Sequence, residues 1–126
     1  MNLPVLTIVV PCYNEQDVLS NTSEELSKVL RGLLDTRLIS EKSTILFVDD
    51  GSKDDTWDLI QMESIHNRMV KGLKLAGNVG HQNALLAGLE IAQKQSDCVI
   101  SIDADLQDDI HVIKEMVEKY NQGYDI

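Results

Sequence analysis

Residues 98–109 read CVISIDADLQDD, a short apolar run that changes abruptly into a cluster of acids. Four carboxylates, from Asp103, Asp105, Asp108 and Asp109, crowd around the amide of Gln107. Like charges this close repel one another, and burial raises the cost of each. A positive partner is therefore expected at this point, and the rest of the sequence indicates what kind.

Three other apolar runs end in polar clusters in the same way. The four runs cover residues 5–10, 44–48, 70–75 and 99–103, and they lead into PCYNE (11–15), DDGS (49–52), GNVGHQN (77–83) and DADLQDD (103–109). A segment with helical periodicity follows each run, at residues 17–34, 55–67, 84–94 and 110–119. This alternation predicts an α/β fold with a parallel sheet and helices on both faces. In such a sheet the carboxyl ends of the strands form the ligand-binding edge.

Composition restricts the function of the protein. The 126 residues fit one domain, and their net charge of −10 argues against a nucleic-acid partner. A phosphate-bearing ligand would need a bound cation as mediator. Cys12 and Cys98 have no CxxC spacing and are expected to be reduced thiols. The first residues, MNLPVLTIVVPCYNE, show no signal-peptide pattern, and their apolar stretch is too short for a membrane span. We therefore expect a cytoplasmic location.

The acids after the fourth run suit a divalent metal. Residues i and i+2 of an extended backbone point to the same side, so Asp103 and Asp105 are expected to converge, and Gln107 could join them. Oxygen ligands favour Mg²⁺ or Mn²⁺ over zinc. The alternative, that acids simply favour the positive end of the next helix, suits Asp108 and Asp109 better.

Two loops have competing interpretations as helix starts or ligand contacts. Gly51 predicts a turn with positive φ, and Ser52 with Asp55 resembles a capping box. Neither feature explains why two acids precede the turn, so Asp50 is a candidate to accept hydrogen bonds from a base or sugar. Asn14 is expected to cap the first helix.

The remaining polar residues allow similar alternatives. Tyr13 could pack or bind, and Glu15 could reach ligand hydroxyls. Glycines near 77–80 could let backbone N–H groups approach an anion at the start of the third helix, and His81 could start that helix or contact a ligand.

Together, these stretches resemble the inverting, GT-A-fold glycosyltransferases of family 2, in particular their polyprenyl-phosphate branch, such as dolichyl-phosphate mannosyltransferase and bacterial undecaprenyl-phosphate glucosyltransferases. The likeness runs from Thr7 to about Gly123. It is carried by VVPCYNE (9–15), FVDDGSKDDT (47–56), NVGHQNALLAGL (78–89) and IDADLQDD (102–109).

The resemblance implies a UDP- or GDP-linked sugar donor, Mg²⁺ or Mn²⁺, and transfer with inversion to a polyprenyl phosphate or another glycan acceptor. It assigns no catalytic base within this sequence. By resemblance, Pro11, Tyr13 and Glu15 line the nucleoside pocket, and Asp50 contacts the base. The resemblance also implies donor contacts at Asn78 and Gly80. Asp103 would lie by the ribose and the metal, and Asp105 and Gln107 would hold the metal.

Two departures from the family pattern stand out. Gly77 occupies a position where the family usually has Arg, so a cationic contact to the donor is missing there, and Asp109 stands where Pro is usual. We expect residues 1–126 to be the nucleotide-sugar-binding half of a catalytic domain, truncated after the fourth strand and helix, with the acceptor half and any membrane segments further on.

Two other functions compete with this interpretation. Gly77 and the truncation are compatible with a non-catalytic nucleotide-binding module. A receiver-like phosphoacceptor domain has a similar length and winding, but its acidic pair follows the first strand, whereas here the pair follows the second.

Overall fold

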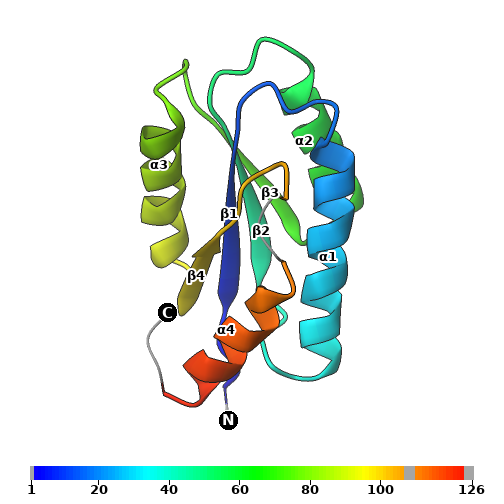
Figure 1. The fold of residues 1–126 in the computed structure, drawn as a ribbon, viewed down its shortest axis with the longest axis vertical. Helices are drawn as coiled ribbons and strands as arrows, with labels where there is room; N and C mark the ends of the chain where they lie inside the picture. The colour runs from blue at the N-terminus through cyan, green and yellow to red at the C-terminus, as the bar shows by residue number, and fades with distance from the viewer. Residues whose placement is uncertain (1, 107–109, 124–126) are drawn as a thin grey trace.

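The computed structural model describes residues 2–106 and 110–123, in which strands and helices alternate along the chain (Figure 1). The elements are β1 (Leu6–Cys12), α1 (Leu19–Asp35), β2 (Thr44–Asp49), α2 (Thr56–His66), β3 (Val70–Lys74), α3 (His81–Gln93), β4 (Cys98–Ser101) and α4 (Val112–Asn121). The four strands form one parallel sheet in the order β3-β2-β1-β4. The predicted parallel α/β fold is therefore confirmed.

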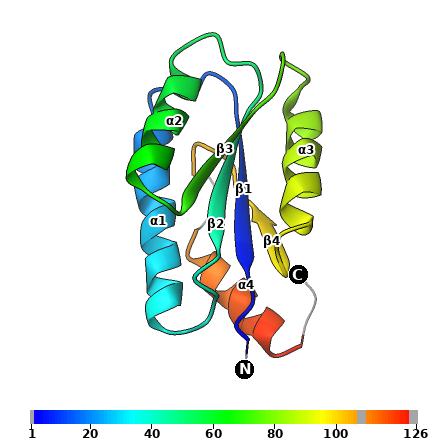
Figure 2. The same cartoon turned by 180° about the vertical axis from the view of Figure 1, so that it is seen from behind.

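Helices cover both faces of the sheet, as predicted (Figures 1 and 2). Alternate residues of β1 point to opposite faces because the side-chain period of a strand is two. One face, including Leu6, Ile8 and Val10, packs against α1, α2 and α4, whereas Val9 on the other face packs against α3. All seven residues of β1 are buried, so this strand is the centre of the core.

Strand β1 continues through Pro11, where the sequence predicted that it would end. Proline lacks an N–H and normally breaks a central strand. Here Ile102 N donates to Val9 O (3.0 Å) and Asp50 N donates to Cys12 O (2.8 Å). Since successive residues face opposite neighbours, Pro11 faces the β4 side, where the ladder ends at Val9 and Ile102, and its missing N–H leaves the pairing of β1 with β2 intact.

The helix caps predicted from sequence are wrong. Helices α1 and α2 have no side-chain cap hydrogen bond. Instead, Asn14 N donates to Ser52 Oγ (2.9 Å), and Lys53 N donates to Asn14 Oδ1 (2.8 Å). Asn14 adopts φ 52°, a left-handed conformation that asparagine tolerates. The residues predicted as caps therefore join the loop after β1 to the loop after β2.

The ends of the helices differ in how well the sequence predicted them. Gly123, with φ 100°, follows α4 and confirms the predicted helix stop. Helix α3 begins at His81, three residues before the predicted start. No helix within residues 2–106 and 110–123 has the length and apolarity needed to span a membrane.

Helix α3 lies very close to the sheet at Gly88. A Cβ placed there would lie 2.6 Å from Val9 Cγ1 and 2.8 Å from Val48 Cγ2. Both neighbours are stiff, β-branched and buried. Gly88 thereby sets the distance between α3, which opens the site described below, and the strands beneath it.

We expect Gly88→Ala to lower the free energy of unfolding by roughly 1–3 kcal/mol, the usual cost of overpacking a core. The matched control is Gly32→Ala in α1, where an added Cβ meets nothing within 4 Å. That change should stabilise the chain by up to about 1 kcal/mol because alanine favours a helix over glycine. Urea denaturation measures both, and equal effects of the two substitutions would contradict the packing described.

Candidate functional site

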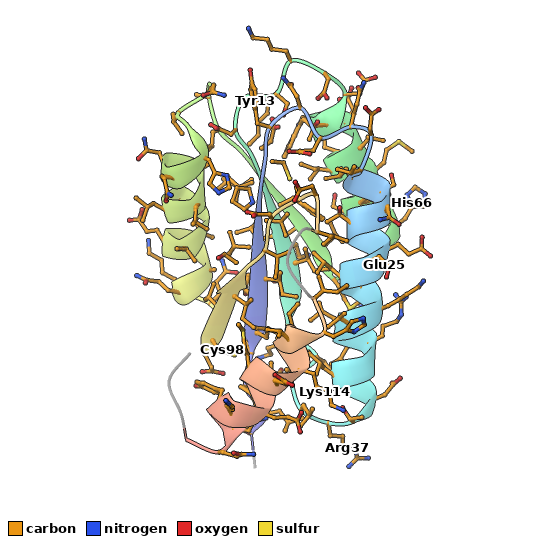
Figure 3. The ribbon with its side chains drawn as sticks, viewed as in Figure 1. Tyr13, Glu25, Arg37, His66, Cys98 and Lys114 are labelled. Carbon is orange, nitrogen blue, oxygen red and sulfur yellow. The ribbon has the colours of Figure 1, made fainter. Side chains whose placement is uncertain are left out.

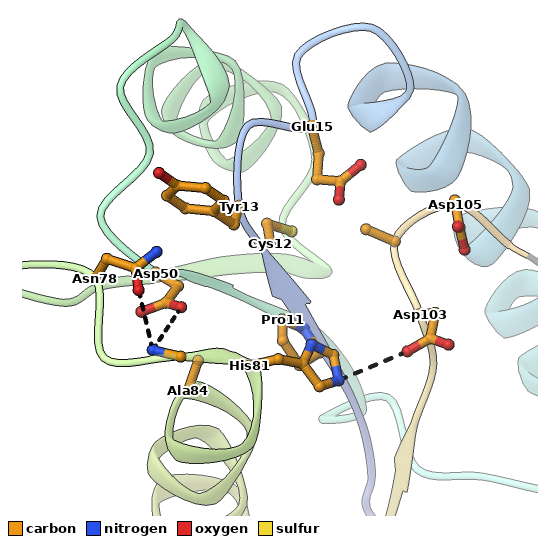
Figure 4. A pocket seen from close by; sticks show the side chains of 12 residues that line it. Pro11, Cys12, Tyr13, Glu15, Asp50, Asn78, His81, Ala84, Asp103 and Asp105 are labelled. Carbon is orange, nitrogen blue, oxygen red and sulfur yellow. Dashed lines mark hydrogen bonds and ion pairs between the residues drawn. The ribbon is translucent and has the colours of Figure 1, made fainter.

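A cavity of about 440 Å³ lies at the carboxyl ends of the strands (Figure 4). Segments that follow β1, β2, β3 and β4 all contribute to its wall. The lining residues are Pro11, Cys12, Tyr13, Glu15, Asp50, Asn78, Gly80, His81, Ala84, Asp103, Ala104 and Asp105.

The residues predicted for the site converge on this cavity. Every predicted donor- or metal-binding residue that the structure describes lines it. Gln107, the third predicted metal ligand, lies outside the described residues, as do Asp108 and Asp109. The predicted grouping of polar strand ends at one edge of the sheet is therefore confirmed, whereas the role of each residue stays a prediction.

Asp103 and Asp105 share the cavity for a different reason from the one predicted. Strand β4 ends at Ser101, and Leu106 N donates to Asp103 O (3.0 Å), which closes a turn with Leu106 at φ 55°. The extended backbone predicted through Asp103 is thus wrong. The next ladder bond on this side would need an N–H from Pro11, which has none. The chain leaves the sheet there and turns back over the cavity.

The turn is fastened to α1 by Thr22, whose hydroxyl donates to the carbonyl oxygen of Ala104. Both residues are buried. Thr22 falls within the helical segment predicted for residues 17–34, but the sequence did not predict this contact. The available signal was a hydroxyl on the leucine-rich face of the helix, which also buries Ser23 and Ser27, because a buried polar group needs a partner.

Asp50 joins the end of β2 to the loop before α3. Its Oδ1 accepts from Val79 N (2.7 Å) and its Oδ2 from Gly80 N (3.1 Å). Gly51 adopts the predicted positive φ, 69°, and a Cβ there would lie only 2.5 Å from Asn78 N. The two loops are therefore in backbone contact. The backbone N–H of Gly80, which was expected to approach a bound anion, donates instead to the carboxylate of Asp50.

Carboxylates that line the cavity repel one another. The pKa of Glu15 is raised above its ordinary value, first by burial, then by the charge of Asp105 and that of Asp54. Asp103, Asp105 and Asp50 add three more carboxylates to the same wall. The site therefore favours a ligand that brings positive charge.

Cys12 also lines the cavity, but its thiol is not set up as a nucleophile. Burial raises its pKa, and the charges of Glu15 and Asp49 raise it further. Its Sγ lies 3.4 Å from Val10 O, to which it donates. A thiol needs its anionic form to attack, so Cys12 is a neutral packing group here. Cys12 and Cys98 are both free, as predicted.

The described residues contain no cluster of three or more His, Cys, Asp or Glu side chains that could hold a metal ion. Asp103 and Asp105 offer carboxylate oxygens to the cavity but would not fill a coordination shell by themselves. Mg²⁺ typically binds one or two carboxylates and completes its shell with water and substrate phosphates. The donor set thus fits a cation that arrives with its ligand.

We expect Thr22→Val to release the turn that carries the two aspartates. Valine keeps the shape of threonine but leaves the Ala104 carbonyl without its partner. The Leu106 amide, which closes the turn, should then exchange with solvent about tenfold faster, since losing a buried hydrogen bond costs about 1.4 kcal/mol. Thr22→Ser keeps the hydroxyl and should leave this rate nearly unchanged. Equal acceleration in both variants, measured by NMR, would contradict the role of the hydroxyl.

We expect Glu15→Gln to stabilise the chain at neutral pH. A raised pKa means that folding favours the protonated acid, so this residue costs stability as the pH rises through its folded pKa. Glutamine removes the repulsion, and Tm should rise by about 1–3 °C, the scale of a partly exposed charge interaction. The difference should vanish below about pH 4, where Glu is protonated in both states. Calorimetry across pH tests this, and a lower Tm at pH 7 would contradict it.

Fold and site together define an α/β domain of the GT-A type. Two solved structures share the fold. The mannosyltransferase PcManGT from Pyrobaculum calidifontis, in complex with GDP-Man and Mn²⁺, superposes with a TM-score of 0.65 at 20% identity, over 83% of this chain and 28% of that one. S. aureus TarS 1-349, in complex with UDP-GlcNAc, gives 0.60 at 17% identity, over 93% and 32%.

The chain belongs to glycosyl transferase family 2, whose sequence pattern matches residues 7–126. The uncharacterized glycosyltransferase YkoT of Bacillus subtilis (strain 168) is 64% identical over 123 residues, which cover 98% of this chain and 36% of YkoT. The bactoprenol glucosyl transferase of Shigella phage SfV is 35% identical over 121 residues, 96% of this chain and 37% of the phage protein.

The family inferred from the motifs is therefore confirmed. Membership of this family excludes the receiver-like phosphoacceptor domain considered above. The chain spans little more than a third of the length of these relatives.

Proposed function

We propose that this chain is the donor-binding half of a metal-assisted, inverting glycosyltransferase. Its donor is a UDP- or GDP-linked sugar, and the acceptor of the whole protein is a polyprenyl phosphate or another glycan, reached at the cytoplasmic face of a membrane. The observation that carries the proposal is the single cavity in which polar groups from all four strand ends meet. The ligands of the structural neighbours, GDP-Man with Mn²⁺ and UDP-GlcNAc, and the bactoprenol glucosyl transferase relatives support this choice.

The acidic wall fits a divalent cation. Asp103 and Asp105 supply the hard oxygen ligands that Mg²⁺ and Mn²⁺ prefer, and Gln107 is the further ligand that the resemblance suggests. When bound, such a cation compensates the negative charge that develops on the departing nucleoside diphosphate.

The remaining lining residues bind and orient the nucleoside. Tyr13 is 39% exposed at the rim, where its ring offers an apolar surface to a base (Figure 3). Glu15 is placed to accept from sugar hydroxyls. Each carboxylate oxygen of Asp50 accepts one hydrogen bond from the loop before α3. Each oxygen has a second lone pair that could accept a hydrogen bond from a base.

A second candidate is a nucleotide-binding module without transferase activity. Position 77, where the family usually has Arg, is not part of the cavity wall, and a Cβ there would meet nothing within 4 Å. Gly77 therefore contributes no charge to the ligand. A full-length protein that binds the nucleotide but neither transfers nor hydrolyses the sugar would favour this candidate.

Calorimetric titration of the chain with UDP and with GDP, each with and without Mn²⁺, tests the proposal. We expect one nucleotide to bind, and Mn²⁺ to tighten its binding at least tenfold. Asp103→Asn should remove most of this Mn²⁺ effect because it deletes a charged ligand. The control, Asp35→Asn, changes the charge equally at the exposed far end of α1 and should leave binding unchanged. A folded chain that binds neither nucleotide at millimolar concentration would overturn the proposal.

A further inference from the structure

Among the described residues that line the cavity, four have carboxylate side chains and His81 alone has a basic side chain (Figure 4). Its imidazole points across the cavity toward Asp103, with Nε2 3.9 Å from Oδ1. This separation is too long for a hydrogen bond. The contact is a long ion pair at most, so it leaves the hydrogen-bonding capacity of Nε2 free.

The position of His81 is fixed by the backbone before it. Gly80, with φ 92°, gives its N–H to Asp50, and its carbonyl accepts from Ala84 N (2.9 Å) in the first turn of α3. Ala84 is fully buried against the sheet. The side chain of His81 can reorient, but its Cα cannot move far because the backbone is held at Gly80 and at Ala84. His81 is therefore presented to the cavity by a rigid frame.

No lysine or arginine within residues 2–106 and 110–123 lines the cavity, and Lys53, in the loop after β2, contacts Asn14 through its backbone N–H. Lys74, at the end of β3, stacks its ammonium 5.8 Å from the centre of the Trp57 ring. Arg37 and Lys114 lie toward the opposite end of the molecule (Figure 3). Position 77 has no side chain to offer. A diphosphate would thus meet one basic side chain, that of His81, among the lining residues that the structure describes.

We propose that His81 donates a hydrogen bond from its imidazole to the diphosphate of the nucleotide ligand, which supplies the contact that Gly77 does not. The inference rests on the proposed function, because it needs a nucleoside diphosphate in the cavity. A hydrogen bond to a charged acceptor is among the stronger polar contacts in proteins. The imidazole shares this role with whatever cation Asp103 and Asp105 hold.

The test compares ligands that differ only in their phosphates. Binding of UDP and uridine, and of GDP and guanosine, is measured by calorimetric titration in the presence of Mn²⁺, for the original chain, His81→Ala, His81→Gln and Gln82→Ala. Gln82 is the exposed neighbour of His81 and is not part of the cavity wall. Circular dichroism and Tm establish that each variant is folded.

We expect His81→Ala to weaken binding of the diphosphate at least tenfold and to leave binding of the matching nucleoside within twofold. His81→Gln keeps an N–H donor and should recover part of the loss, whereas Gln82→Ala should match the original chain. Equal losses for nucleoside and diphosphate, or no loss for either, would overturn the proposal.

Two further results separate this inference from its premises. Weaker binding of Mn²⁺ alone by His81→Ala, followed by its paramagnetic resonance signal, would make His81 a metal ligand and overturn the proposal. If the original chain binds neither diphosphate, it is the proposed function that fails, before any variant is compared.

Discussion

The site depends on an absent hydrogen-bond donor in the central strand. Pro11 has no N–H, so the ladder between β1 and β4 cannot continue past Val9 and Ile102. The backbone after β4 is thereby released from the sheet and closes the turn that holds Asp103 and Asp105 over the cavity. On its other side β1 keeps pairing with β2 as far as Cys12, which keeps the floor of the cavity rigid.

Around this break, each loop is fastened by a hydrogen bond to another loop or element. Thr22 of α1 holds the aspartate turn, Asn14 and Ser52 bind two loops to each other, and Asp50 binds the loop before α3. Such contacts hold functional groups in place before a ligand arrives, which reduces the entropy lost on binding. They also explain why polar residues that look like helix caps in the sequence cap no helix. Their hydrogen bonds serve the site instead.

The sequence predicted the sheet, the helices and the membership of the cavity because these follow from periodicity and from the common edge of parallel strands. The sequence did not predict local contacts that the same residues can make in more than one way. Asn14 and Ser52 suit caps and loop contacts equally well, and only the packing of the two loops decides between them. The turn at Asp103 depends on Pro11, a residue 92 positions earlier, which no local pattern includes.

The electrostatics of the cavity link its stability to its ligand. Burial, and then the charges of Asp105 and Asp54, raise the pKa of Glu15, which costs folding energy in the free chain, a typical exchange of stability for function. A cation alone would relieve the repulsion, and an anionic nucleotide alone would increase it. Under the proposed function, the favourable state is therefore the pair, in which the cation neutralises both the protein and the diphosphate. Each ligand would then improve the binding of the other, a reciprocal coupling by which an acidic chain could select an anionic substrate.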